Sequence, residues 1–89
     1  MRSIITVLGK DKTGIISNVS TILAEANVNI LDISQTILQE YFTMIMLVDL
    51  SKCKISFNEL KDILDAKGNE MSLSIKIQRE DIFNSMHNI

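Results

Sequence analysis

The architecture of the chain follows from residues 2–26, RSIITVLGKDKTGIISNVSTILAEA. Residues 2–9 predict a strand whose two alternating faces are both apolar, which is typical of the centre of a sheet. Its apolar residues are Ile4, Ile5, Val7 and Leu8. A short polar turn follows, and residues 15–26 then repeat apolar side chains every three or four positions. That spacing predicts an amphipathic helix directly after the turn.

Three further segments predict strands. Residues 29–38 place Leu31, Ile33 and Ile37 on one parity and mostly polar side chains on the other. Residues 41–50 are apolar on both faces, like residues 2–9. Residues 71–78 alternate cleanly between apolar and polar side chains, which predicts an edge strand with one solvated face.

A second helix is predicted between the last two of these strands. Ser56 and Glu59 have the spacing of a capping box at its start. Its buried stripe is expected to contain Leu60, Ile63 and Leu64. Gly68 suits the left-handed residue that ends a helix. A short final helix is expected from about Asp81, with apolar residues on one side: Ile82, Phe83, Met86 and Ile89.

The resulting order, βαββαβ, predicts a ferredoxin-like α+β fold in a single domain over residues 1–89. Right-handed crossovers place the strands in an antiparallel four-stranded sheet of order 4-1-3-2, with both helices on one face. The central positions then fall to residues 2–9 and 41–50, the strands that are apolar on both faces. Since an uncovered apolar sheet face usually marks an interface, we expect self-association through this face, a sheet edge or the first helix.

The composition argues against several classes of function. The net charge of −2 and the pI near 5.2 provide no basic surface for nucleic acid or an anionic membrane. No apolar run approaches the roughly 18 residues of a membrane helix, and the first residues lack a signal-peptide pattern. The single cysteine, Cys53, has no partner for an internal disulfide. We therefore expect a cytoplasmic protein with no nucleic-acid or membrane partner.

The candidate binding site is the turn Lys10-Asp11-Lys12-Thr13-Gly14-Ile15. Backbone N–H groups at a helix start lack intrahelical partners and carry partial positive charge, so this turn is suited to a small anionic or zwitterionic ligand. Gly14 would allow close approach to the backbone. Two interpretations of Asp11 are open: contact with a ligand, or a hydrogen bond to the backbone of Thr13 or Gly14 within the turn.

Nowhere in the sequence do a nucleophile, a base and an orienting group fall on converging elements, so we expect no enzyme. Gly9 and Gly14 have the spacing of P-loop glycines, but Ile15 and Ile16 stand where a P-loop needs lysine and Ser/Thr.

Two other kinds of site are also not predicted. A hydrolase resembling acylphosphatase, on the same fold, would need an arginine in the turn, whereas the only arginines are Arg2 and Arg79. His87 has no cysteine, aspartate or histidine at metal-ligand spacing. We expect neither a metal nor a cofactor.

The element order and four short segments resemble the ACT domain family. The segments are Lys10-Asp11-Lys12-Thr13-Gly14-Ile15, Asn27-Val28-Asn29-Ile30, Ile33-Ser34-Gln35-Thr36 and the closing Ile82-Phe83 to Asn88-Ile89. The last two are similar to those of small, free-standing bacterial ACT domain proteins. The resemblance covers essentially the whole chain.

The resemblance implies a ligand-sensing module of the kind that often binds amino acids and pairs with a second copy, with the ligand at the interface. By resemblance, the ligand contacts are Asp11, Lys12, Thr13, Gly14 and Ile15 in the turn, and Asn29 and Ile30 at the start of the second strand.

We therefore expect a non-catalytic regulatory module that binds a small molecule, an amino acid in the first instance, and forms a homodimer. The regulated partner would be a metabolic enzyme or a regulator. One alternative is a structural adaptor that acts by protein–protein contact without a ligand. A less favoured alternative is a small hydrolase on the same fold.

Overall fold

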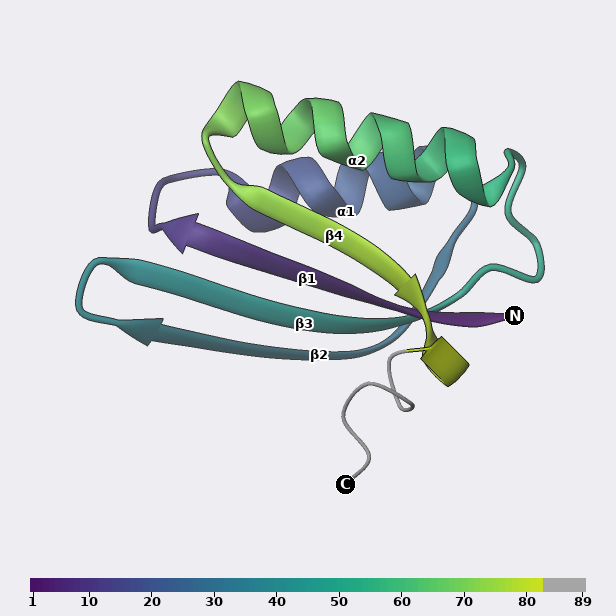
Figure 1. Cartoon of the computed structure of the whole chain (residues 1–89), viewed down its shortest axis with the longest axis horizontal. Helices are drawn as coiled ribbons and strands as arrows, with labels where there is room; N and C mark the ends of the chain where they lie inside the picture. The colour runs from purple at the N-terminus through teal and green to yellow at the C-terminus, as the bar shows by residue number, and fades with distance from the viewer. Residues whose placement is uncertain (83–89) are drawn as a thin grey trace.

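The computed structural model describes residues 1–82 and has the element order β-α-β-β-α-β (Figure 1). Its elements are β1 (Arg2–Lys10), α1 (Ile15–Glu25), β2 (Asn29–Leu38), β3 (Tyr41–Asp49), α2 (Phe57–Met71) and β4 (Ser74–Arg79). The strands form one antiparallel sheet in the order β2-β3-β1-β4. The predicted ferredoxin-like fold, its strand order and the central positions of β1 and β3 are confirmed.

The predicted final helix begins one residue early, because Glu80–Ile82 already form a helical turn. The rest of that predicted helix lies outside the described residues.

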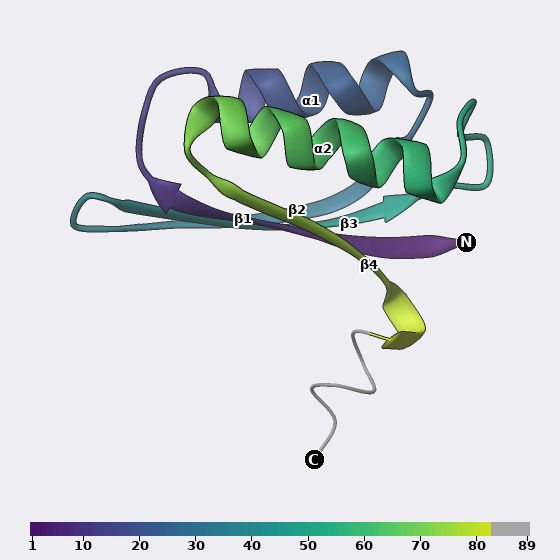
Figure 2. The same ribbon diagram turned by 45° about the horizontal axis from the view of Figure 1, so that its top comes forward.

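The core lies between the sheet and the two helices, which pack on the same face (Figure 2). β1 and β3 pair along their whole lengths, so Ile5 and Val7 lie opposite Met46 and Met44. All four side chains are fully buried. The fully buried helix residues above them are Val19, Leu23, Leu60 and Leu64. Burial of each such apolar side chain contributes roughly 1.5–3 kcal/mol, so this layer supplies most of the driving force for folding.

The capping box at the start of α2 is confirmed. The Glu59 N–H donates to Ser56 Oγ at 3.1 Å, and the Ser56 N–H donates to Glu59 Oε1 at 3.3 Å. These two bonds satisfy backbone donors that a helix start otherwise leaves without partners.

The predicted end of α2 at Gly68 is wrong. The helix continues to Met71, and Ser72 takes the left-handed conformation with φ 58°. A Cβ at Gly68 would lie 2.8 Å from the Leu73 carbonyl oxygen, so glycine is needed there for close packing against the returning chain. Ile63, expected in the buried stripe, is also misplaced, since its side chain is 44% exposed.

The edge strand β2 lies largely beyond the reach of the helices. Ile33 and Ile37 pair with Met46 and Phe42 and therefore face the helix side, yet both are exposed. A bulge between Ile30 and Asp32 shifts the register of β2. Leu31 therefore has no partner on β3 in the ladder that pairs Ile33 and Ile37. Every residue from Leu31 to Leu38 is exposed.

The opposite face of the sheet, here called the open face, has no covering helix within residues 1–82 (Figure 2). Its central residues alternate with the core residues along β1 and β3: Ile4, Thr6, Leu8, Tyr41, Thr43, Ile45 and Leu47. None of these is buried, and none carries a formal charge. The apolar character predicted for the second face of both central strands is therefore present, and no helix among the described residues covers it.

Ser3 of β1 is fully buried, and its hydroxyl has no hydrogen-bond partner within residues 1–82. A buried hydroxyl without a hydrogen bond lowers the free energy of unfolding by roughly 1–3 kcal/mol. Replacing the serine with alanine removes that hydroxyl and leaves a void the size of one atom. We expect Ser3→Ala to raise the free energy of unfolding by about 1 kcal/mol in urea denaturation. Ser34→Ala, at an exposed position of β2, is the control and should change it by less than about 0.5 kcal/mol. A loss of stability in Ser3→Ala would contradict this account.

Candidate functional site

The turn from β1 into α1 leaves the start of the helix open. Gly14 occupies the N-cap position with φ 91°, a left-handed conformation that favours glycine. No side chain within residues 1–82 caps the helix, and its first turn contains no acidic residue. The first backbone N–H groups of α1 therefore keep their hydrogen-bonding capacity and the positive end of the helix dipole.

A groove of about 340 Å³ opens beside this helix start. Its lining residues are Asp11, Lys12, Gly14, Ile15, Ile16 and Ser17 from the turn and α1, Gln35 and Ile37 from β2, and Phe42 from β3. The apolar side chains of α1, β2 and β3 make one part of the wall, and Asp11 and Lys12 bring opposite charges to its rim. The groove thus combines an apolar surface with groups that suit a zwitterion.

Asp11 is attached to the fold by its backbone. Its N–H donates to the Glu40 carbonyl oxygen at 2.7 Å, which joins the turn to the β2–β3 hairpin. Within residues 1–82 its carboxylate accepts no hydrogen bond, so the alternative of a bond to Thr13 or Gly14 is not observed. The carboxylate is exposed and accessible to a ligand.

The other two side chains of the turn have different surroundings. Lys12 Nζ donates to the Met71 carbonyl oxygen at the end of α2, where a positive charge also complements the helix dipole. Lys12 therefore ties the turn to α2 while lining the groove. Thr13 is exposed and does not line it.

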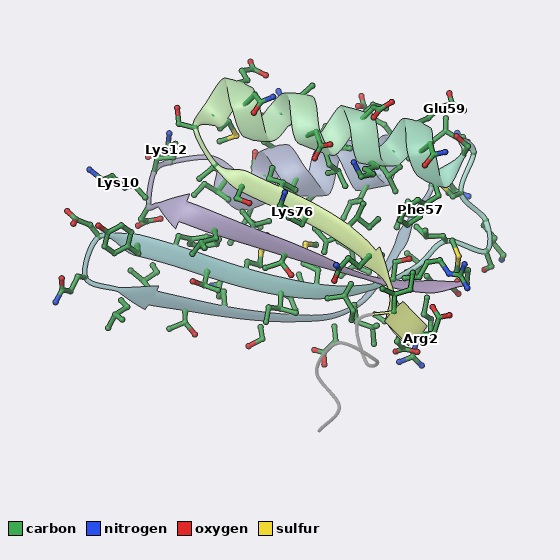
Figure 3. All side chains as sticks on the ribbon, viewed as in Figure 1. Arg2, Lys10, Lys12, Phe57, Glu59 and Lys76 are labelled. Carbon is green, nitrogen blue, oxygen red and sulfur yellow. The ribbon has the colours of Figure 1, made fainter. Side chains whose placement is uncertain are left out.

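Asn29 and Ile30 lie at the far end of the sheet from the groove. Asn29 pairs with Asp49, whereas the groove is next to the end at which Leu38 pairs with Tyr41. Asp49 and Tyr41 are eight positions apart along β3, a distance of roughly 27 Å. Figure 3 labels Lys10 and Lys12 at one end of the sheet and Arg2 at the other. One chain therefore does not bring Asn29 and Asp11 to the same small ligand.

A negative charge accompanies Asn29 at its end of the sheet. The Ser51 N–H donates to Asp49 Oδ1 at 2.9 Å, and this bond lowers the pKa of the Asp49 carboxyl below its ordinary value. Asp49 Oδ1 also lies 3.7 Å from the Met1 ammonium, so the carboxylate at this end of the sheet is already partnered.

Gln35, Ile37 and Phe42 line the groove but were not among the ligand contacts predicted from the sequence. They reach it because the turn at Gln39-Glu40 folds the ends of β2 and β3 back beside the end of β1. The predicted β2–β3 hairpin was the feature of the sequence that could have indicated their position, because its register places residues 35–37 opposite residues 42–44.

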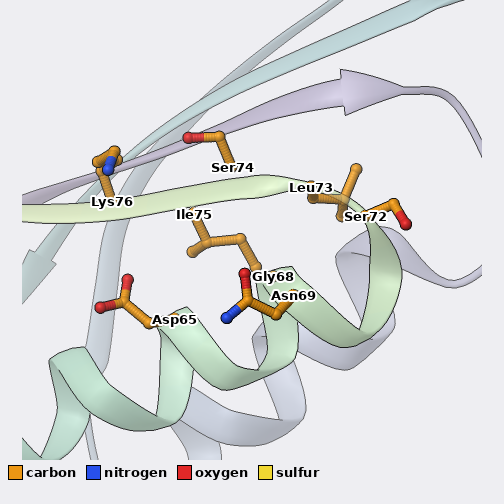
Figure 4. A pocket seen from close by; sticks show the side chains of 8 residues that line it. All are labelled: Asp65, Gly68, Asn69, Ser72, Leu73, Ser74, Ile75 and Lys76. Atoms are coloured by element: carbon orange, nitrogen blue, oxygen red, sulfur yellow. The ribbon is translucent and has the colours of Figure 1, made fainter.

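A larger hollow of about 610 Å³ lies between the end of α2 and β4 (Figure 4). It is lined by Asp65, Gly68, Asn69, Ser72, Leu73, Ser74, Ile75 and Lys76. The Asp65 carboxylate is already paired with Lys61 Nζ at 3.2 Å. The carbonyl of Gly68 accepts from the Leu73 N–H at 2.8 Å. Because its polar groups are largely partnered or freely solvated, this hollow is a weaker candidate than the groove despite its size.

Two further features are absent from residues 1–82. No helix there is long and apolar enough to span a lipid bilayer. No group of three or more His, Cys, Asp or Glu side chains in that range is placed to hold a metal ion.

Comparison with known proteins gives one consistent result. A family model of the ACT domain matches residues 2–78. A UPF0237 protein of Clostridium acetobutylicum is 64% identical over 89 residues, the full length of both chains. The solved ACT domain protein from Streptococcus pneumoniae superposes with a TM-score of 0.80 at 48% identity, over 93% of each chain. A putative glycine cleavage system transcriptional repressor superposes with a TM-score of 0.76 at 25% identity, over 86% of this chain and 44% of that one.

Gly14→Ala and Gly14→Asn separate backbone strain from crowding at the helix start. In either variant the new Cβ would lie 3.2 Å from Asn18 Nδ2, so the crowding is matched. Asparagine adopts positive φ more readily than alanine. We expect Gly14→Ala to lower the free energy of unfolding by roughly 1–3 kcal/mol and Gly14→Asn to lower it less, in urea denaturation. Equal losses would assign the cost to the Asn18 contact instead.

Proposed function

Because the chain belongs to the ACT domain family, we propose that it is a non-catalytic regulatory module that binds a free amino acid in the groove at the start of α1. The observation that carries the proposal is the uncapped helix start beside an unpaired carboxylate, Asp11, within residues 1–82. The likeness to a putative transcriptional repressor supports a regulatory role.

The groups in the groove match the groups of an amino acid. The first N–H groups of α1 suit the α-carboxylate, because they are free donors at the positive end of a dipole. Asp11 suits the α-ammonium by charge. Ile15, Ile37 and Phe42 offer an apolar surface to the ligand side chain.

The exposed edge strand supports a homodimer through β2 and the adjacent face of α1. Among residues 1–82 no strand pairs with the outer edge of β2, which presents a row of unpaired backbone groups together with the apolar side chains of Ile33 and Ile37. The neighbouring helix carries a single charged residue, Glu25, so little charge would be desolvated on contact.

A two-fold dimer of this kind would also reunite the two halves of the predicted site. When two copies of β2 pair antiparallel, the Asn29 end of one strand lies beside the Leu38 end of the other. Asn29 of the partner subunit would then approach the groove that contains Asp11. The amino acid would be held between subunits, and its binding would favour the dimer.

The two alternative functions, a hydrolase and an adaptor, would require different structural features. A hydrolase of the acylphosphatase kind needs an arginine at the turn, whereas Arg2 pairs with Glu80 at 2.6 Å and Arg79 with Asp81 at 3.0 Å, at the other end of the sheet. An adaptor needs only the exposed β2 edge and no ligand. The function proposed here predicts both a ligand and a dimer, with a metabolic enzyme or a regulator as the downstream partner.

Binding is tested by thermal shift against the standard amino acids, followed by calorimetry on the one that stabilises the protein. Asp11→Asn keeps the side-chain shape but removes the charge, so we expect it to weaken binding by roughly 1–3 kcal/mol. Asp62→Asn, an exposed carboxylate of α2 outside the groove, is the matched control and should bind as the parent does. Stabilisation by no amino acid would favour the adaptor, and equal binding by both variants would place the site elsewhere.

A site shared between subunits predicts complementation. Asp11→Ala and Asn29→Ala chains should each bind weakly alone. A mixed dimer would contain one site with both changes and one with neither, and random pairing makes about half of the dimers mixed, so we expect equal mixing to restore binding at about a quarter of all sites. Calorimetry before and after co-refolding measures this. Failure of the mixture to recover would show that the two residues do not act across an interface.

Charge placed on the β2 edge should disrupt the dimer. Ile33 is 42% exposed on β2 and Ile63 is 44% exposed on α2, so they form a matched pair. We expect Ile33→Lys to sediment as a monomer at concentrations where the parent and Ile63→Lys are dimers, because a lysine there would be desolvated at the interface. A dimeric Ile33→Lys would rule out association through β2.

A further inference from the structure

Charged groups are scarce in the groove at the start of α1. Within residues 1–82, Asp11 and Lys12 are the only charged residues that line it. Lys12 Nζ already donates to the Met71 carbonyl oxygen at the end of α2. Lys10, the nearest lysine in the chain, pairs with Tyr41 on the open face of the sheet. Once Asp11 is matched with an α-ammonium group, these residues offer no further free charge to the side chain of a bound amino acid.

The apolar lining residues form a buried floor and two exposed walls. Ile15 and Phe42 belong to the core, with exposed fractions of 2% and 3%. Ile16 on α1 and Ile37 on β2 line the same groove but are 39% and 57% exposed. A ligand side chain in the groove would therefore remove apolar surface of both elements from water.

The two remaining lining side chains, Ser17 and Gln35, are polar but uncharged. Both are exposed, so water satisfies their hydrogen-bonding groups whether or not a ligand is bound. An apolar side chain beside them leaves no buried polar group without a partner, which is the situation that would oppose its binding. Neither residue supplies a counter-charge for an acidic or basic ligand side chain.

We infer that the amino acid bound in the groove has an uncharged, apolar side chain, of the kind found in Val, Leu, Ile, Met and Phe, and that Ile16 and Ile37 select it. The assignment rests on the proposed function, because Asp11 and the first N–H groups of α1 serve there as partners of the α-ammonium and α-carboxylate groups. A charged side chain would exchange water for the walls of the groove without gaining an ion pair, which is unfavourable. An apolar side chain gains from burial against the same walls.

Pairs of amino acids that match in length and differ in charge test this specificity on the full chain. Norleucine and lysine share the same unbranched hydrocarbon chain, and lysine adds an ammonium group. Methionine, glutamine and glutamate also have similar lengths and end in an apolar, a polar and a charged group. In calorimetry we expect norleucine to bind at least about tenfold more tightly than lysine, and methionine at least about tenfold more tightly than glutamate, with glutamine weaker than methionine.

The outcomes of this series separate the specificity from the proposed function. Tighter binding of lysine, glutamate or glutamine than of its apolar counterpart would overturn the specificity, while the binding of an amino acid would still hold. Binding of none of the standard amino acids would reject the proposed function and the specificity with it.

A charge placed on one wall should change the preference. Ile37→Glu introduces a carboxylate into the groove, and Ile63→Glu introduces one at an exposed position of α2 that does not line it. We expect the affinity for lysine relative to norleucine to rise at least about tenfold in Ile37→Glu and to stay within about twofold of the parent value in Ile63→Glu. Any weakening common to both ligands, such as a weaker β2 dimer, cancels in this ratio. An unchanged ratio in Ile37→Glu would overturn the assignment of Ile37 as a specificity-determining residue.

Discussion

The two helices cover only part of the surface that the four-stranded sheet presents, and the rest of the structure depends on this incomplete coverage. Right-handed crossovers place α1 and α2 on the same face, so the core forms over β1, β3 and β4. β2 is left exposed along its length, and the opposite face has no helix over it within residues 1–82. The surfaces proposed for function are all places where backbone or apolar surface remains uncovered.

The groove illustrates how binding can arise without catalytic residues. A glycine in the left-handed conformation ends the turn at Gly14 and leaves the helix start uncapped, so donors are available at the positive end of the dipole. Asp11 adds an acceptor whose charge no neighbour within residues 1–82 neutralises. In the proposed dimer, a ligand held between two subunits binds the dimer better than the separate chains. That difference in affinity is what allows a small molecule to act as a signal.

The open face and the β2 edge are different kinds of uncovered surface. An edge strand offers directional backbone hydrogen bonds, which select another strand as partner. The open face offers only apolar area, which any suitable apolar segment can bury. The two surfaces therefore select different kinds of partner.

The sequence alone determined those features of the structure that depend on residues close together in the chain. Apolar periodicity identified the strands and helices and the central places of β1 and β3, and the Ser56–Glu59 capping box located the start of α2. Local patterns misplaced the end of α2, because Gly68 serves a contact with Leu73 rather than the termination of the helix. Only the tertiary structure decided that Gln35, Ile37 and Phe42 line the groove and that Asn29 lies far from Asp11. The register between strands, the bulge after Ile30 and the reach of each helix are set by packing between distant segments, and no local pattern of residues contains that information.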